Sequence, residues 1–444
     1  MSADGISRWP NLVRIYHPSL LTQACAAACL LFLLDGGQAE AQFFSACWSG
    51  SAKELESSIE MHEEHTYRLE HKFHTDYYYQ KEIASDFQGG TLADVRRFIA
   101  DLAPRKTGVL FYGLNTDANR LCSWLVVPSG KIYYQATPVS SIAFSTDIRD
   151  LVRSQNARGV SVPNPPGAPD LGAWSKIGRM LLPPNIERGL LFEQIDTLIV
   201  VPVFAVGAVP YGALPLGDGQ LVDRMSVVIA PGFFIFMEQP PLTRKQWPNG
   251  IVVGDPQSTD KDFEPLRGAR KEALAVAELL GVDPLIGGRA SSTAVRKAIE
   301  ARPETSLVYI ATHGIADEDN PRDDSFLLMS DLRWTARAIG DLKLKAQPLV
   351  VLSACETGLG KNFDVGTIGM ARAWQHVGAS QVVMSLWSVN DEVTGRLMVQ
   401  FVKSISAGQP ADKALQTAMR HTRDNDSKNP AHWAGFTIFG VPTR

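Results

Sequence analysis

Residues 306–314 read SLVYIATHG and residues 348–358 read PLVVLSACETG, and these two stretches decide the fold class. Each is a short apolar run of β-forming residues that stops at one reactive side chain, His313 in the first and Cys355 in the second. The carboxyl ends of parallel strands meet at the edge of an open sheet where ligands bind. A cysteine needs a nearby histidine to be a good nucleophile near neutral pH. The two stretches therefore predict a cysteine hydrolase, and they favour a peptidase.

The rest of the chain alternates between strand-like and helical patterns. A helix over 174–182 is expected to end at Pro183 and Pro184. Strands alternating with helices indicate an α/β fold in which helices cover both faces of a mostly parallel sheet. The expected strands are 107–113, 198–202, 250–254 and 381–386, and the other expected helices are 269–280, 292–301, 335–342, 368–377, 393–406 and 410–424.

Length and composition narrow the classes of function. A chain of 444 residues is long for a single core and suits two halves of one large domain. The formal net charge of -4 comes with no basic stripe, so nucleic acid is not an expected partner. There is no CxxC motif, and His62 and His65 have the wrong spacing for a HExxH zinc helix. We therefore expect no metal, and the predicted chemistry needs no organic cofactor.

The first 41 residues have the three-part pattern of a secretory signal peptide. Arg8 and Arg14 precede an uncharged, mainly apolar run over 20–34, and Ala39 and Ala41 mark a cleavage site. The run is about 15 residues long, shorter than the ~20 that span a bilayer as a helix. The pattern predicts an exported, periplasmic or secreted protein. An uncleaved anchor, or a misassigned start codon and a cytoplasmic protein, is the alternative.

The chain contains only five cysteines. A chain cleaved after Ala41 keeps Cys47, Cys122 and Cys355. This odd count fits a reactive thiol at Cys355 together with a disulfide between the other two. Two unpaired cysteines are the alternative, and the sequence does not decide between them.

Six ordered motifs resemble one protein family. They are residues 209–214 (VPYGAL), 311–314 (ATHG), 352–358 (LSACETG), 369–374 (GMARAW), 378–391 (GASQVVMSLWSVND) and 431–436 (AHWAGF). Together they are similar to the CHAT-domain proteins of the caspase, separase and gingipain superfamily of cysteine peptidases. The resemblance implies a caspase-like mostly parallel sheet sandwiched by helices over about 92–444, in two halves. The domain limits it implies are a signal peptide at 1–41, a short helical segment at 42–91, a pseudo-catalytic half at about 92–245 and a catalytic half at about 246–444.

The resemblance also implies roles for individual residues. Cys355 is the expected nucleophile of an endopeptidase that acts on a protein or peptide substrate, and His313 the expected general base and acid. The backbone N–H groups of Gly314 and Cys355 are the expected oxyanion hole. Asp391 and Trp387 are the expected substrate-binding residues, and a carboxylate at Asp391 would favour a P1 arginine. The alternatives are that Asp391 caps the helix beginning near residue 392 and that Trp387 is a core or pocket-wall aromatic.

Other readings of the same residues stay open. A catalytically silent binding or scaffold module, or a hydrolase with a non-peptide substrate, would use the same fold. The acidic loop at 317–324 could attract basic substrates, although a solvated loop is the simpler interpretation. This loop and the Pro/Gly-rich loop at 159–170 are expected sites of proteolytic processing. Asp255, at a strand end, is expected to have a turn role.

Overall fold

The computed structural model describes residues 49–74, 90–115, 117–140, 144, 146–148, 171–234, 247, 249–355, 357–363, 366–387 and 391–443. These residues belong to one compact unit that spans residues 44–444. The predicted signal peptide, Cys47 and the loop at 159–170 lie outside the described residues. Within the described ranges, no helix has the length and hydropathy of a membrane span.

The centre of the molecule is an eleven-stranded sheet in the order β3-β2-β1-β4-β7-β18-β17-β14-β10-β8-β9. The strands of the amino-terminal half are β1 (Thr107–Asn115), β2 (Arg120–Val126), β3 (Ile132–Pro138), β4 (Thr197–Val201) and β7 (Ser226–Ile229). Those of the carboxyl-terminal half are β8 (Ile251–Pro256), β9 (Leu285–Gly287), β10 (Leu307–Ala311), β14 (Leu349–Ser353), β17 (Gln381–Ser385) and β18 (Phe436–Gly440). Within each half the central strands are parallel, so the predicted fold class is confirmed.

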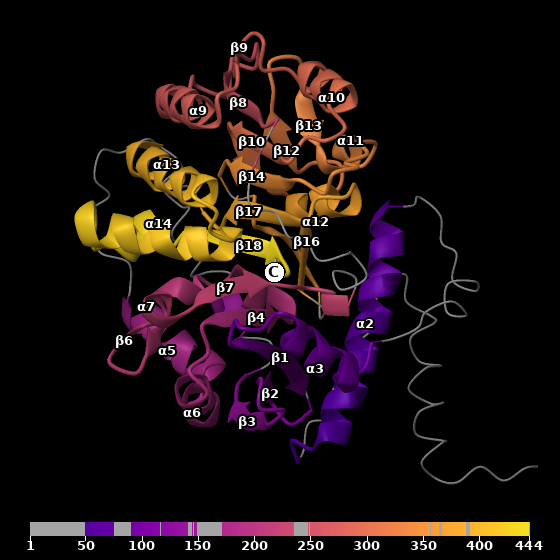
Figure 1. The fold of residues 1–444 in the computed structure, drawn as a ribbon. Coiled ribbons are helices and arrows are strands. Elements are labelled where there is room, and N and C mark those ends of the chain that lie inside the picture. Colours follow the sequence, from indigo (N-terminus) through magenta and orange to yellow (C-terminus); the bar gives the residue numbers. More distant parts are fainter. Residues whose placement is uncertain are drawn as a thin grey trace, which may run out of the picture. The chain divides into compact units, whose positions relative to one another are not determined.

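Helices cover the sheet on both faces, and Figure 1 shows the two layers on either side of it. One face carries α2 (Ala52–His74), α3 (Leu92–Asp101), α10 (Ser292–Ala301), α11 (Ala336–Ile339) and α12 (Met370–His376). The other carries α5 (Leu171–Leu181), α6 (Pro184–Phe192), α9 (Arg267–Leu280), α13 (Asp391–Ser406) and α14 (Ala411–Asn425). Because both faces are covered, β4, β10, β14 and β17 are buried along their whole length.

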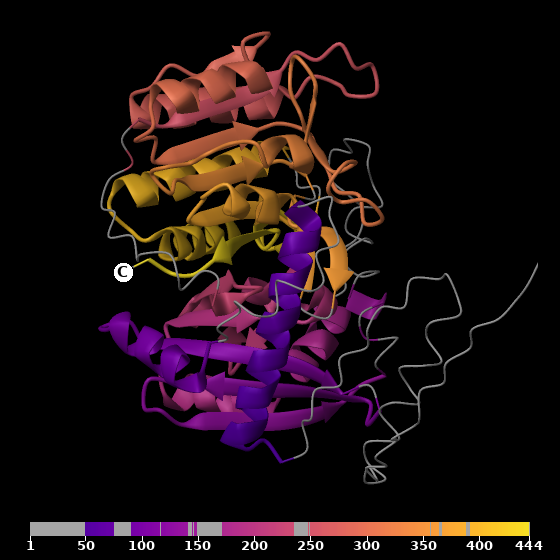
Figure 2. The same cartoon turned by 90° about the vertical axis from the view of Figure 1, so that its right-hand side faces the viewer.

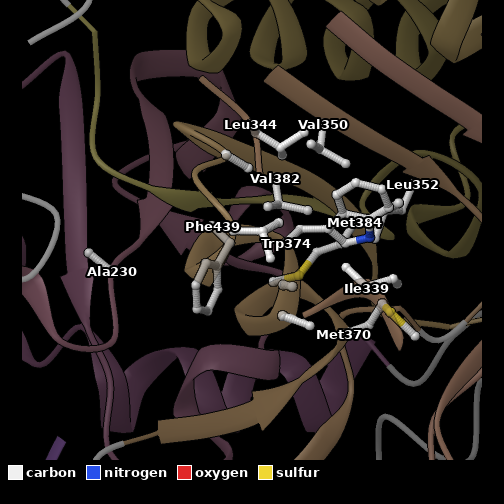
Figure 3. Close-up of a cluster of buried hydrophobic side chains, with 14 of the residues drawn as sticks. Ala230, Ile339, Leu344, Val350, Leu352, Met370, Trp374, Val382, Met384 and Phe439 are labelled. Atoms are coloured by element: carbon white, nitrogen blue, oxygen red, sulfur yellow. The ribbon is translucent and has the colours of Figure 1, made fainter. Parts of the chain in front are cut away.

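Alternate side chains of β14 belong to two different hydrophobic cores, one on each face of the sheet. Val350 and Leu352 of β14 pack with Trp374 of α12 in the first core (Figure 3). Leu349 and Val351 of the same strand belong to the core under α9, α13 and α14. This period of two is that of a strand with both faces buried. α2 packs on the first core, and in both views it runs from the level of β3 to that of β16 (Figures 1 and 2).

Three features join the halves of the sheet. β18 pairs antiparallel with β17 along its length and parallel with β7 through one pair, Phe439 and Ile229. At the amino-terminal edge of β4 and β7, the buried carboxylate of Asp412 on α14 accepts hydrogen bonds from Arg105 and, at 2.6 Å, from Ser226. At the other edge, the 3-10 helix η3 (Phe204–Ala208), which follows β4, contacts a hairpin of β15 (Gly360–Phe363) and β16 (Gly366–Gly369). The segments that follow β4 and β14 are therefore in contact.

Three helix predictions need correction. The helix expected from residue 368 begins only at Met370, because Gly369 is still extended and a Cβ there would lie 2.4 Å from the Leu359 carbonyl. The helix expected over 335–342 is the single turn of α11. After α5, Pro184 begins a second helix, α6, that the sequence did not predict. Proline is tolerated in the first turn of a helix, where its missing N–H has no partner to lose.

Candidate active site

The two strands that end near His313 and Cys355 are neighbours in the sheet. β10 and β14 run parallel, with Ala311 opposite Ser353. His313 and Cys355 each follow two residues later, so they leave the sheet side by side at its carboxyl edge. Cys355 is half-buried and is a thiol rather than part of a disulfide.

The residue after the histidine lies directly against the cysteine turn. A Cβ added at Gly314 would lie 2.6 Å from the Cys355 carbonyl oxygen and 3.0 Å from Cγ2 of Thr357. Any side chain here would therefore push the two strand ends apart. Glycine at this position permits the close approach of the backbones.

The ring of His313 is oriented by the segment between β8 and α9. Its Nε2 lies 2.7 Å from the backbone carbonyl of Glu264, and its ring packs against Phe263 with the centroids 5.1 Å apart. A carbonyl oxygen can only accept a hydrogen bond, so Nε2 carries a proton. In the neutral ring Nδ1 is then the basic nitrogen, and it is the one able to take a proton from a thiol.

A small second sheet holds the backbone of the histidine. The Leu328 amide in β12 (Phe326–Leu328) donates to the His313 carbonyl at 2.9 Å, and the Thr312 hydroxyl donates to the Leu328 carbonyl at 2.6 Å. Gly314 in β11 (Gly314–Ile315) is therefore in a non-hydrogen-bonded pair with Leu327. Its N–H points away from β12, as an oxyanion donor in this position requires.

The turn that carries Cys355 is tied to the end of β17. The Ser385 hydroxyl donates to the Ala354 carbonyl at 2.6 Å, and the Thr357 hydroxyl donates to the same carbonyl at 3.1 Å. The Gly358 amide donates to the Ser385 carbonyl at 2.7 Å. Sequence reasoning gave Ser385 and Thr357 no role of their own. The available signal was a polar residue at the end of an apolar strand, next to the reactive motif.

The predicted substrate-binding residues follow β17. α13 begins at Asp391, whose side chain lies outside the described residues. Trp387 is 2% exposed, donates its ring N–H to the Ala431 carbonyl at 2.9 Å and packs against Trp174. It therefore lies in the core, which matches the alternative interpretation of this residue, and its contact with a substrate stays a prediction.

Asp255 and the acidic loop have structural partners. Asp255 accepts from the Leu266 amide at 2.9 Å, which is the turn role expected of it. Asp317 accepts from the amides of residues 319 and 320 and so organises its own loop. Arg337 pairs with Asp323 and holds the pKa of that carboxyl below its ordinary value. Part of the negative charge of the loop at 317–324 is thereby compensated.

His62 of α2 has a structural partner. His62 directs Nε2 at the Pro202 carbonyl, 3.1 Å away, and so helps to hold α2 on the amino-terminal half. Among the residues that the structure describes, no group of histidine, cysteine, aspartate and glutamate is arranged to hold a metal ion.

Comparisons with known proteins agree with this architecture. The family model of the CHAT domain matches residues 173–441. Tetratricopeptide repeat protein 28 is 27% identical over 244 residues in Mus musculus and 25% identical over 246 residues in Homo sapiens. These matches cover 45% and 46% of this chain, and the chain spans only 10% of each of these relatives.

Two solved structures are similar to this chain. The Saccharomyces cerevisiae separase–securin complex at 3.0 Å matches with a TM-score of 0.58 and 10% identity, over 88% of this chain and 34% of that chain. The Arg-specific cysteine proteinase gingipain R matches with a TM-score of 0.44 and 12% identity, over 68% and 76%. At 10% identity, the likeness to separase shows the fold alone.

Proposed function

Since the chain belongs to the CHAT-domain family, we propose that it is a cysteine endopeptidase in which Cys355 is the nucleophile and His313 is the general base and acid. The observation that carries the proposal is the juxtaposition of the two strand ends. His313 and Cys355 follow neighbouring parallel strands, and Gly314 packs on the Cys355 backbone. A binding module has no need of an oriented imidazole beside a thiol.

The reaction follows from these positions. Nδ1 of His313 takes the thiol proton, and the thiolate of Cys355 attacks the carbonyl carbon of the scissile peptide bond. The N–H groups of Gly314 and Cys355 donate to the oxygen that gains the negative charge. The intermediate then breaks its C–N bond, and His313 returns the proton to the leaving amine. Water, deprotonated by His313, hydrolyses the resulting thioester and restores the thiol.

The position of Asp391 supports a basic P1 residue. β17 lies next to β14, and the chain from its carboxyl end leads within six residues to Asp391, the first residue of α13. Asp391 thus follows the strand whose end braces the Cys355 turn. A carboxylate there would pair with an arginine by a charge-assisted hydrogen bond. A protein substrate is consistent with this arrangement, since an edge formed by loops of several strands is open to an extended chain.

An exported location is also part of the proposal. Cys122, on β2, is disulfide-bonded, while Cys47, its predicted partner, lies outside the described residues. Disulfides persist mainly in oxidising compartments. This bond therefore supports the export that the amino-terminal pattern predicts.

The test is cleavage of a P1-diverse fluorogenic peptide library by the purified protein, run beside Cys355→Ala and His313→Ala. Turnover is expected for the unmodified protein with P1 arginine or lysine. It should be lost in Cys355→Ala and fall by roughly 10²-fold to 10⁴-fold in His313→Ala. Turnover that survives in Cys355→Ala would exclude this nucleophile. No turnover by the unmodified protein would favour a binding module with the same fold.

A further inference from the structure

The segment that orients His313 has no regular secondary structure of its own. Residues 257–266, here the Glu264 segment, connect β8 to α9 and present the Glu264 carbonyl to the His313 ring. Asp255 holds one end of it, through the Leu266 amide. A loop held only at its ends would not define the direction of one carbonyl, so the middle of the segment needs a support.

That support is Arg333 in β13 (Arg333–Thr335). Its Nε and Nη2 donate to one oxygen of Asp260 at 2.9 and 2.6 Å. Its guanidinium lies over two aromatic rings, 4.8 Å from the centroid of Phe326 and 5.7 Å from that of Phe263. The same Phe263 ring packs edge-on against Phe326 and faces the imidazole of His313. Arg333 therefore contacts the Glu264 segment at three residues: it pairs with Asp260 and, at 3.7 Å, with Asp262, and its guanidinium lies over the Phe263 ring.

The hairpin of β12 and β13 thus holds both parts of the histidine. β12 binds the His313 backbone through Leu328, and β13, through Arg333, fixes the segment that binds the His313 ring. The same hairpin therefore holds both the backbone and the ring of His313, although Glu264 and His313 are 49 residues apart in the chain. We propose that Arg333 is a positioning residue that sets the tautomer and orientation of His313 through Phe263 and the Glu264 carbonyl. The catalytic meaning of this proposal rests on the proposed function.

An ordinary surface ion pair is the competing explanation. The Arg333 side chain is 49% exposed and that of Asp260 is 22% exposed, and pairs of this kind contribute little to stability. The chain offers a matched control in Arg337, which is 42% exposed and pairs with Asp323. Arg337 lies on α11, and its partner Asp323 belongs to the loop at 317–324 rather than to the Glu264 segment. A surface role predicts that substitutions of Arg333 and Arg337 behave alike, whereas a positioning role predicts that they differ.

The experiment compares Arg333→Ala with Arg337→Ala in the full chain by three measurements. The first is the ¹⁵N chemical shifts of the His313 imidazole, assigned with His313→Ala, which report the tautomer. The second is the rate of Cys355 alkylation by iodoacetamide near neutral pH, which depends on the thiolate that the imidazole stabilises. The third is kcat and KM on a peptide that the unmodified protein cleaves.

For Arg333→Ala we expect a mixture of His313 tautomers, alkylation slower by about tenfold, and a similar loss in kcat with KM unchanged. Arg337→Ala should leave all three as they are. Arg333→Lys should not rescue the loss, because an ammonium lacks the planar fork whose Nε and Nη2 both bind Asp260. Unchanged tautomer and alkylation in folded Arg333→Ala would overturn the proposal.

A second variant, and two measurements that need no substrate, cover the cases in which Arg333→Ala does not fold or the protein has no turnover. If Arg333→Ala does not fold, Asp260→Asn removes the charge while keeping the shape, and the same changes are expected in smaller size. Loss of folding in both variants would overturn the proposal in favour of a purely structural role. The first two measurements need no substrate. A tautomer that depends on Arg333 in a protein without turnover would therefore refute the proposed function and leave the positioning role intact.

Discussion

Replacing Gly314 with alanine tests the close approach of the two strand ends on which the proposed chemistry depends. Ordinary contact of a Cβ begins at 3.4 Å, whereas this Cβ would lie 2.6 Å from the Cys355 carbonyl oxygen. The two backbones must therefore separate by about 0.8 Å, the difference of these distances. The nearest atom belongs to the backbone, and Ser385 and Thr357 tie the same turn to β17, so the strain cannot be relieved by rotating a side chain.

A displacement of this size lies in the range that costs roughly 10²-fold in rate, or about 2.7 kcal/mol of barrier. We expect kcat/KM and the rate of Cys355 alkylation to fall by about that factor, with overpacking lowering the free energy of unfolding by ~1–3 kcal/mol. The control is Gly212→Ala, where the nearest atoms lie 3.5 Å and farther away. If a folded Gly314→Ala variant has the same kcat/KM and the same rate of Cys355 alkylation as the unmodified protein, the reasoning is refuted.

Three further predictions concern charge and specificity. Asp412→Ala should lower the free energy of unfolding in urea by about 3–5 kcal/mol, because it leaves the Arg105 side chain, which is 13% exposed, without the buried carboxylate that compensates its charge; exposed Asp218→Ala should not, and equal effects would contradict the role of this pair. Burial lowers the pKa of His432, so its unfolded form binds more protons below the ordinary value of 6.5, and stability should fall as the pH drops below 6.5. That fall should be smaller in His432→Gln, and an identical pH dependence would exclude this residue as its source. Asp391→Asn should reduce the preference for P1 arginine over an uncharged P1 by roughly tenfold or more; because asparagine also caps helices, an unchanged preference would leave only the capping role.

The parts of the fold that the sequence predicted are those set by local patterns. Leu307–Ala311 and Leu349–Ser353 are uninterrupted apolar runs, and such runs form strands buried on both faces wherever helices alternate with them. The same runs placed His313 and Cys355 beyond the ends of strands, and β10 and β14 proved to be neighbours. Periodicity also located α9, α10, α13 and α14, although single boundaries moved by one or two residues.

What the sequence could not predict depends on contacts between distant segments. The bond from Ser385 to Ala354 joins residues 31 apart, and the bond from His313 to Glu264 joins residues 49 apart. A serine at the end of an apolar strand stands out in the sequence, but neither it nor a backbone carbonyl in a loop indicates which distant segment it bonds to. Arg333 likewise reads as an ordinary surface residue until Phe263 and Phe326 are seen beneath it.

The position of β18 in the sheet has a consequence for how the protein is made. Phe436–Gly440 lies between β7 and β17, yet it follows all the other strands of the sheet in the chain. About 200 residues separate β7 from β18, which at usual rates of synthesis is a delay of roughly 10 to 40 s. Throughout that interval each half exposes an open strand edge, the kind of surface on which nascent chains pair wrongly. The sheet cannot be completed until residue 440 has left the ribosome, so a stalled chain that already contains His313 and Cys355 lacks the strand that lies between β7 and β17. A chaperone that shields the edges of β7 and β17 would act in this window.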